Sequence, residues 1–169
     1  HMWDGSATEL EKNLKIAAEL LEQAAKAKII LEVEIGVVGG EEDGVANDIN
    51  EKLYTAPGDY ERTVEMLGAG EKGRYLLAAT FGNVHGVYKP GNVKLRPIIL
   101  HNSQVQVQEK FGTGEKPLNL VFHGGSGSTL EEIREAVSYG VVKMNIDTDL
   151  QWALWEGIKN FYVKNEGYL

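Results

Sequence analysis

The chain has 169 residues, the length of one ordinary domain, and its 25 acidic and 17 basic side chains give a net charge of −8. That charge argues against nucleic acid and against an anionic membrane as partners, and the absence of cysteine excludes a disulfide framework. The sequence shows neither an apolar run of about 18 residues nor a signal-peptide pattern, so we predict a cytoplasmic protein with no membrane partner.

The first predicted elements are the end of a strand and a long helix. Residues Trp3 to Ser6 have the composition of a strand end and a turn, and Ser6 with Glu9 has the spacing of a capping box. Apolar residues then recur at helical spacing from Leu10 to Ala24, with charged residues on the opposite face. This pattern predicts an amphipathic helix that packs on a sheet.

The next predicted strand, residues 29–36, carries two carboxylates on one face. Apolar residues alternate there with Glu32 and Glu34, whereas both faces of a covered parallel sheet are usually apolar. Two interpretations stay open at this point. The carboxylates lie on a solvated edge face, or they line a polar barrel interior in which Glu34, nearer the carboxyl end of the strand, reaches a metal or a proton.

The segment 37–52 is rich in glycine and acidic residues and is predicted to be a long loop. Its run of carboxylates is either simply solvated or carried by a mobile lid, where one of them acts as a general base once closure removes water. A short helix is then predicted from Pro57 to about Gly68, because proline is favoured at the first helical position.

Two histidines follow successive strands of the predicted sheet. The strand predicted over 75–81 leads to His85, and the apolar run 118–122 ends directly on His123. One histidine in such a place is more often structural, but two in equivalent positions are more easily explained as facing a shared centre. Neutral imidazole suits zinc, and a catalytic zinc ion typically has three protein ligands.

The small residues after His123 form a candidate phosphate loop. Residues Gly124 to Ser128 precede a helix predicted over 129–139, and Ser128 with Glu131 has the capping-box spacing. Free backbone N–H groups at a helix start favour an anion by about 0.3–1 kcal/mol. A flexible turn is the alternative, and a dinucleotide loop is disfavoured because the third glycine of GxGxxG is missing.

Two further helices are predicted, over 97–111 and 149–164. The first contains His101, which points away from the strand ends and is expected on the surface. The second carries Trp152, Ala153, Trp155 and Phe161. Residues of this kind at helical spacing belong more often to the hydrophobic core than to a ligand-binding site.

The predicted elements alternate strand and helix along the whole chain. A strand remnant is followed by four full strands, the last over 141–146, with the polar residues at strand carboxyl ends. This is the arrangement of β/α barrels and of open α/β sheets. Four strands and a remnant are too few for a complete eight-stranded barrel.

Four motifs in this order resemble one family. LEVEIGVVGGEEDG, FGNVHGVYKPGNV, VFHGGSGS and GVVKMNIDTD are similar to class II, zinc-dependent fructose-bisphosphate aldolases, in the subgroup with the GGEEDG loop and the NIDTD strand. The resemblance implies an α/β fold of the (β/α)8 TIM-barrel family, present as a partial barrel of four full parallel strands plus a strand remnant, with helices outside. Residues 1–169 are then one partial barrel domain, the C-terminal half of an aldolase barrel.

The resemblance also implies an activity. It is an aldehyde-lyase reaction of glycolysis and gluconeogenesis, the reversible cleavage of fructose 1,6-bisphosphate to dihydroxyacetone phosphate and glyceraldehyde 3-phosphate. The implied cofactors are Zn²⁺ and a monovalent cation, Na⁺ or K⁺, and the full-length enzyme is expected to be a homodimer. This segment alone is expected to be inactive, because the family's third zinc-ligating histidine and catalytic aspartate lie on an earlier strand. The alternatives are a non-catalytic half-barrel that self-associates and a tagatose-bisphosphate-type aldolase.

The family's functional residues can be carried over by motif. His85 and His123 match ligands of the catalytic zinc, and Asp4 and Glu34 match a second metal position. Glu42 and Asn145 match catalytic residues, with Glu42 as the loop carboxylate that exchanges a proton next to the carbonyl. The substrate-binding matches are Gly86, Gly124, Gly125, Ser126, Asn145, Ile146, Asp147 and Thr148.

Overall fold

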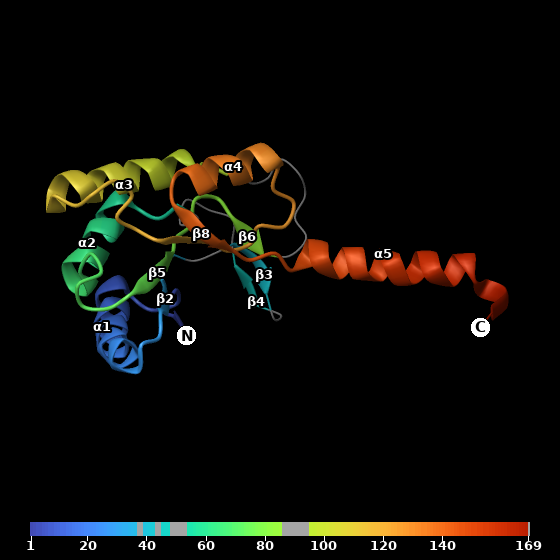
Figure 1. The fold of residues 1–169 in the computed structure, drawn as a ribbon, viewed down its shortest axis with the longest axis horizontal. Coiled ribbons are helices and arrows are strands. Elements are labelled where there is room, and N and C mark those ends of the chain that lie inside the picture. Colours follow the sequence, from blue (N-terminus) through green and yellow to red (C-terminus); the bar gives the residue numbers. More distant parts are fainter. Residues whose placement is uncertain (37–38, 43–44, 48–53, 86–94, 169) are drawn as a thin grey trace.

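The computed structural model of the chain describes residues 1–36, 39–42, 45–47, 54–85 and 95–168, with only the backbone of 39–42, 45–47 and 85. Its main sheet has five parallel strands in the order β1-β2-β5-β7-β8, so each strand lies beside the strand of this sheet that follows it in the chain (Figure 1). The strands are β1 (Met2–Asp4), β2 (Leu31–Glu34), β5 (Tyr75–Ala78), β7 (Leu120–Phe122) and β8 (Val141–Met144). The predicted partial (β/α)8 barrel, with four full strands and a remnant, is confirmed.

Helices connect these parallel strands, as predicted. The connecting helices are α1 (Leu10–Ala27), α2 (Pro57–Leu67), α3 (Ile98–Phe111) and α4 (Leu130–Ser138). Helix α5 (Thr148–Lys164) follows β8 and precedes the short 3-10 helix η2 (Glu166–Tyr168). No helix in the described ranges combines the length and the apolar character needed to cross a bilayer.

The start of α1 differs from the predicted capping box. The N-cap is Glu9, whose carboxylate accepts hydrogen bonds from the N–H groups of Glu11 and Lys12. Ser6 is not the cap because it belongs to the preceding turn, where its N–H and its hydroxyl donate to the Asp4 carboxylate at 2.9 and 2.6 Å. A longer acidic side chain therefore satisfies the first turn of the helix.

The capping box of α4 is real but lies one residue later than predicted. Thr129 is the N-cap and Glu132 the reciprocal partner, with the Thr129 N–H donating to the Glu132 carboxylate at 2.8 Å. Ser128 lies in the preceding turn, where its N–H donates to the Gly125 carbonyl at 3.3 Å. The turn thus uses the residue that the sequence pattern assigned to the cap.

A second sheet was missed by the sequence analysis. It has the order β4-β3-β6, made of β3 (Gly39–Glu42), the antiparallel β4 (Val45–Asn47) and the parallel β6 (Val84–His85). The loop predicted over 37–52 therefore contains a pair of strands. The strand predicted over 75–81 is also too long, because the Thr80 carbonyl accepts from the Thr55 N–H and Phe81 forms a bridge with Tyr54.

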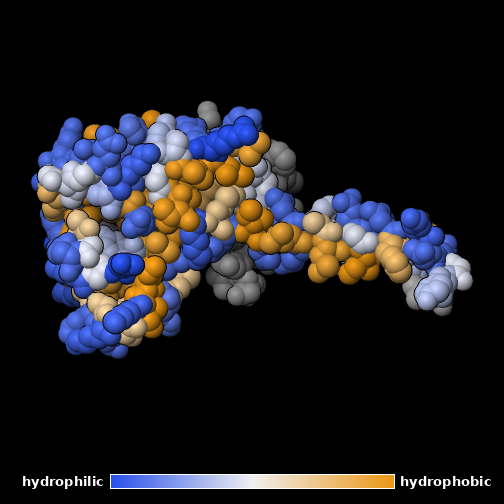
Figure 2. Space-filling model, viewed as in Figure 1, coloured by the Kyte–Doolittle hydropathy of each residue, from blue (hydrophilic) through white to orange (hydrophobic). Residues whose placement is uncertain are grey.

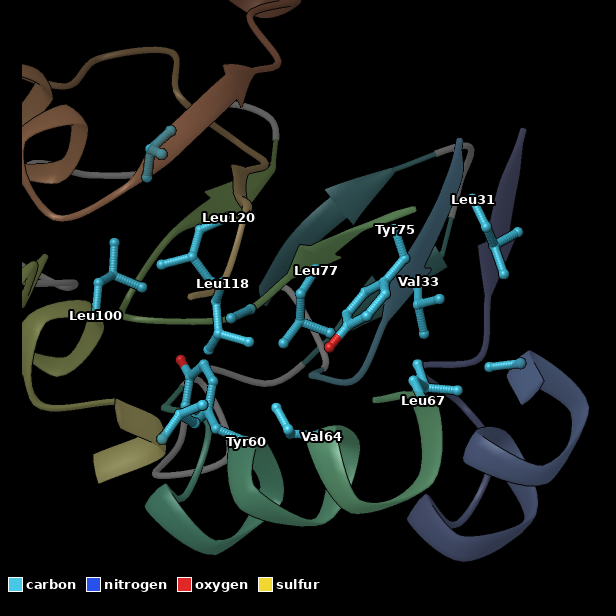
Figure 3. Packing of buried hydrophobic residues seen from close by; sticks show 14 of the residues in the cluster. Leu31, Val33, Tyr60, Val64, Leu67, Tyr75, Leu77, Leu100, Leu118 and Leu120 are labelled. Carbon is cyan, nitrogen blue, oxygen red and sulfur yellow. The ribbon is translucent and has the colours of Figure 1, made fainter. Parts of the chain in front are cut away.

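The core lies between one face of the main sheet and helices α1 to α4. Alternate residues of the strands, including Val33, Leu77 and Leu120, point at this face and are fully buried (Figure 3). The helices add Leu14, Tyr60 and other buried side chains. Each fully buried large apolar side chain contributes about 1.5–3 kcal/mol, so this layer holds the strand ends in place.

The opposite face of the sheet carries polar residues. Asp4 pairs in register with Glu34, and Val121 with Lys143. Glu32 and Glu34 are only 6% and 5% exposed, and β2 lies between β1 and β5 rather than at an edge. The solvated-edge interpretation of the two carboxylates is therefore wrong, and the burial agrees with a polar interior.

Helix α5 extends away from the rest of the described chain (Figure 1). None of its residues is buried, and Trp152, Trp155 and Phe161 are 62%, 49% and 59% exposed. The prediction that these aromatics are core residues is wrong for this chain, because no described element covers the apolar side of α5. Figure 2 shows apolar residues gathered along one side of the helix.

Candidate active site

His123 is the central described residue at the carboxyl ends of the strands. It follows β7 directly and is 4% exposed. Its ring Nε2 lies 2.8 Å from Oε1 of Glu32, and its Nδ1 lies 3.9 Å from Oε2 of Glu34. The polar face of the sheet therefore brings one imidazole between two buried carboxylates of β2.

Glu32 joins two strands through its carboxylate. Oε1 faces His123, and Oε2 accepts from Nζ of Lys143 on β8 at 2.5 Å. Burial raises the pKa of Glu32, but the hydrogen bonds from Lys143 and His123 outweigh burial and hold the pKa below its usual value. The carboxylate is thus anionic at neutral pH although it is buried.

Two asparagine side chains fix the ends of the strands. Nδ2 of Asn83 donates to the His123 carbonyl at 3.0 Å, and Nδ2 of Asn13 donates to the Glu34 carbonyl at 2.8 Å. Both are 1% exposed, and Asn13 also accepts from the Trp3 indole at 2.8 Å. The main chain of both candidate ligands is therefore held by buried amides.

The roles of these supporting residues were not predicted from the sequence. Asn13 lies three positions after Leu10, inside the apolar stripe of α1, and a polar residue in such a stripe is the signal that was available. Asn83 and Lys143 carry no comparable local signal. Their partners, His123 and Glu32, are 40 and 111 residues away in the chain.

The predicted metal ligands are only partly brought together among the described residues. His123 and Glu34 are neighbours, and Asp4 pairs with Glu34 across β1 and β2 but is exposed. Among the described side chains, which do not include His85, no group of three or more His, Cys, Asp or Glu is close enough to hold a metal ion. His85 lies on β6 by its backbone, and the convergence of the two histidines stays a prediction.

The glycine loop packs closely on the end of β8. A Cβ on Gly125 would lie 2.3 Å from Met144 Cε and 3.1 Å from the Asn145 carbonyl oxygen, so a larger residue would have to displace the end of the Met144 side chain and shift the Asn145 backbone. The Gly125 N–H donates to that same carbonyl at 2.9 Å. The two segments predicted to bind the phosphorylated substrate, 124–126 and 145–148, therefore lie side by side.

The prediction of free N–H groups in this loop is wrong at three positions. The N–H groups of Gly125 and Ser128 donate to carbonyls, and the Gly127 N–H donates to Oδ2 of Asp149 at 2.9 Å. The Ser126 hydroxyl in turn accepts from the Asp149 N–H at 3.2 Å. The loop thus already holds one carboxylate, because Asp149 stands at the start of α5 and reaches back to it.

The other predicted substrate residues lie on the exposed side of this rim. Asn145 is half-buried and its N–H donates to the Phe122 carbonyl at 2.8 Å, whereas Ile146 and Asp147 are exposed. The Asp147 carboxylate accepts from Gln151 at 2.9 Å, and Thr148 begins α5. Gly86 and the side chain of Glu42 lie outside the described residues, so their roles stay predictions.

Comparison with known proteins gives one consistent family. The family model described as "Fructose-bisphosphate aldolase class-II" matches residues 1–168. Fructose-bisphosphate aldolases of Mycobacterium bovis and Corynebacterium glutamicum are 66% and 59% identical over 167 residues, 98% of this chain and 48% of each relative. The crystal structure of fructose-bisphosphate aldolase from Campylobacter jejuni is similar to the whole of this chain, which covers 47% of the chain in that crystal structure. The TM-score is 0.82 and the sequence identity is 51%. The chain spans about half the length of the curated relatives it matches.

Proposed function

The chain belongs to the class-II fructose-bisphosphate aldolase family, and we propose that it supplies part of the active site of a zinc-dependent enzyme that reversibly cleaves fructose 1,6-bisphosphate. The observation that carries this proposal is the buried imidazole of His123, held beside Glu34 at the strand ends and next to the glycine loop. A tagatose-type substrate is less favoured, because relatives at 56% to 66% identity are named for the fructose substrate.

The residues present fit a zinc ion. Two donors that bind one zinc ion at about 2.0–2.2 Å lie no more than about 4.3 Å apart. His123 Nδ1 and Glu34 Oε2 are 3.9 Å apart, which allows an ion on this side of the ring. We assign His85 as the second imidazole ligand of this ion, whose coordination Glu34 or water completes, and Asp4 with Glu34 as ligands of a second metal position. Asn83, two residues before His85, is hydrogen bonded to His123, which supports this grouping.

A bound zinc ion would supply Lewis-acid stabilisation of the negative charge that develops on the substrate when its C3–C4 bond breaks. The protein residues orient the substrate against this centre. Gly124, Gly125 and Ser126, together with Asn145 to Thr148, are proposed to hold dihydroxyacetone phosphate, because the Gly125–Asn145 contact joins the two segments at the same rim as His123. Asn145 is proposed to contact the reacting end of the substrate, and Gly86 with the Gly124 backbone to hold a monovalent cation.

Glu42 is proposed to move the proton at the carbon next to the carbonyl. It lies on β3, which pairs with β6, and Gly40 of β3 is in register with His85. The backbone of Glu42 thus follows, by two residues, the strand position that pairs with His85, which supports a role for this residue beside the candidate metal ligand. General-base catalysis of this kind contributes about 10²–10⁴-fold in rate.

We also propose that the full-length protein is a homodimer. The apolar residues of α5 support this, since large exposed apolar patches usually mark interaction surfaces. Sedimentation of the full-length protein should show a dimer that Leu154→Glu weakens, and a monomeric full-length protein would contradict the proposal. The cytoplasmic location stays a prediction.

Zinc uptake by the purified chain tests the metal part of the proposal. Dialysis against zinc should show bound metal that is lost in His123→Ala and strongly reduced in His85→Ala. The matched control is His101→Ala, because His101 is exposed on α3, where its ring is tilted against that of Tyr139 with centroids 5.0 Å apart. Equal uptake by all three variants would contradict the proposed centre.

Binding of dihydroxyacetone phosphate tests the substrate part. Calorimetry should show binding that a chelator abolishes and that Asn145→Ala weakens, whereas Asn102→Ala, on the exposed surface of α3, leaves it unchanged. Binding that is insensitive to the chelator would contradict a metal-dependent site. Cleavage of fructose 1,6-bisphosphate at aldolase-like rates by this chain alone would overturn the expectation that the segment is inactive.

A further inference from the structure

Glu32 is buried in the candidate site, but nothing in the proposed reaction uses it. Both of its carboxylate oxygens are engaged, Oε1 with Nε2 of His123 at 2.8 Å and Oε2 with Nζ of Lys143 at 2.5 Å. Its side chain is 7% exposed, as against 41% for Lys143. A carboxylate in this place acts on His123 rather than on a ligand in solvent.

The contact with Glu32 decides which nitrogen of His123 faces the candidate metal. An anionic carboxylate only accepts hydrogen bonds, so the proton of the neutral ring is on Nε2. The lone pair is then on Nδ1, which is the nitrogen 3.9 Å from Oε2 of Glu34. The geometry thus places the ligating nitrogen on the side of the other proposed metal ligands.

Lys143 binds the other oxygen of the Glu32 carboxylate. It pairs with Val121 in the register of β7 and β8, and its ammonium group donates to Oε2 of Glu32 across the polar face of the sheet. An ammonium group only donates, so it holds the carboxylate in place without competing for His123. The three side chains connect β2, β7 and β8, the strands whose ends form the site.

We propose that Glu32 is a positioning residue for His123, which it holds as the Nε2–H tautomer with Nδ1 presented to the metal, while Lys143 anchors the Glu32 carboxylate. This inference rests on the metal-binding role proposed above for His123. Partners of this kind, which orient a ligating histidine through its other nitrogen, typically change metal affinity by about 10–100-fold when they are removed.

In the variant Glu32→Gln we expect the ring of His123 to change its tautomer. The amide has one acceptor and one donor group, and Lys143 can only donate, so the amide oxygen turns to Lys143 and the amide NH₂ to His123. Nε2 must then accept, and the proton moves to Nδ1. In Glu32→Gln/Lys143→Met the amide is free to turn back, so the Nε2–H tautomer should be restored.

Nitrogen-15 NMR of the metal-free chain at about pH 8 reports this tautomer directly. We expect Nε2–H in the unmodified chain, Nδ1–H in Glu32→Gln and Nε2–H again in the double variant. A doubly protonated His123 ring that only forms an ion pair with Glu32 would instead keep both N–H groups, and no reversal would be seen. Nδ1–H in the unmodified chain would overturn the inference, and this result does not depend on whether Glu32→Gln folds.

Zinc affinity, measured by competition with a chromophoric chelator, supplies the second readout. Glu32→Gln should bind zinc about 10–100-fold more weakly, with partial recovery in the double variant. The matched control is Glu22→Gln, which also removes a lysine-paired carboxylate but on the exposed face of α1. Unchanged affinity in Glu32→Gln, with zinc uptake lost in His123→Ala, overturns this inference alone. Zinc uptake that survives in His123→Ala instead overturns the proposed metal centre.

Discussion

The stretch from α1 to β7 and the stretch from β8 to α5 use the same unit, a parallel strand and an amphipathic helix, but they are packed differently. In α1 the residues Leu14, Ala17 and Leu21 are at most 1% exposed. In α5 the residues Leu150, Leu154 and Ile158, also at helical spacing, are 62% to 68% exposed. The pattern therefore determines which side of a helix is apolar, but not which element covers it.

The first prediction compares buried and exposed phenylalanines in these two stretches. Phe122→Ala should lower the free energy of unfolding by about 3–5 kcal/mol, because Phe122 is fully buried and packs edge-on against Phe81, with ring centroids 4.7 Å apart. Phe161→Ala on α5 should change it by no more than about 0.5 kcal/mol, because Phe161 is 59% exposed. Urea unfolding at low protein concentration measures both, and equal costs would show that α5 is covered in solution.

The second prediction compares two asparagines that make the same hydrogen bond. Asn83 is buried and donates to the His123 carbonyl at 3.0 Å, whereas Asn165 is half-buried and donates to the Phe161 carbonyl at 2.8 Å in a solvent-exposed hydrogen bond. Asn83→Ala leaves a buried carbonyl without its donor and should cost about 1–3 kcal/mol. In Asn165→Ala, water replaces the amide.

The Asn165 variant should therefore stay within about 0.5 kcal/mol of the unmodified chain in urea unfolding. Amide exchange of the β7 residues gives a second measurement, since loss of the Asn83 contact should loosen the end of that strand. A cost for Asn165→Ala equal to that for Asn83→Ala would contradict the assignment of stability to burial.

The same contrast explains what the sequence could predict. The alternation of strands and helices is encoded locally, in the two-residue period around Val33 and the helical period of α1, and it is confirmed. The position of His123 at the end of β7 follows from the same local pattern. Burial of Glu32 and Glu34 was one of two open interpretations. The two-residue period of a strand shows which side chains share a face of the sheet, but not whether another part of the protein covers that face.

The parts that could not be predicted depend on contacts between distant residues. The second sheet pairs Gly40 with His85, two segments with little local strand signal. The role of Lys143 depends on Glu32, which is on another strand of the sheet. The capping residues differ by one or a few positions because turns compete for the same hydroxyl groups, as Ser6 shows with Asp4.

The last and smallest expected effect concerns charged residues that connect packed helices. Glu65 on α2 accepts from Lys110 of α3 at 2.9 Å and from Arg62 at 3.0 Å, and Arg62 also binds Glu11 of α1. Hydrogen bonds from Lys110 and Arg62 lower the pKa of Glu65. A carboxylate with a lowered pKa in the folded state stabilises the fold above its ordinary pKa, and the effect is lost as the pH falls through the lowered value.

The stability of the unmodified chain should therefore fall as the pH drops below 4.5, the ordinary pKa of this group, and Glu65→Gln should show a smaller fall. Glu22→Gln is the control, because Glu22 pairs with Lys26 of the same helix and both side chains are more than 70% exposed. Its pH profile should follow the unmodified chain more closely, since solvent screens such a pair. Urea midpoints over the acid range measure all three, and overlapping profiles for Glu65→Gln and Glu22→Gln would show that charges connecting helices contribute no more than those within one helix.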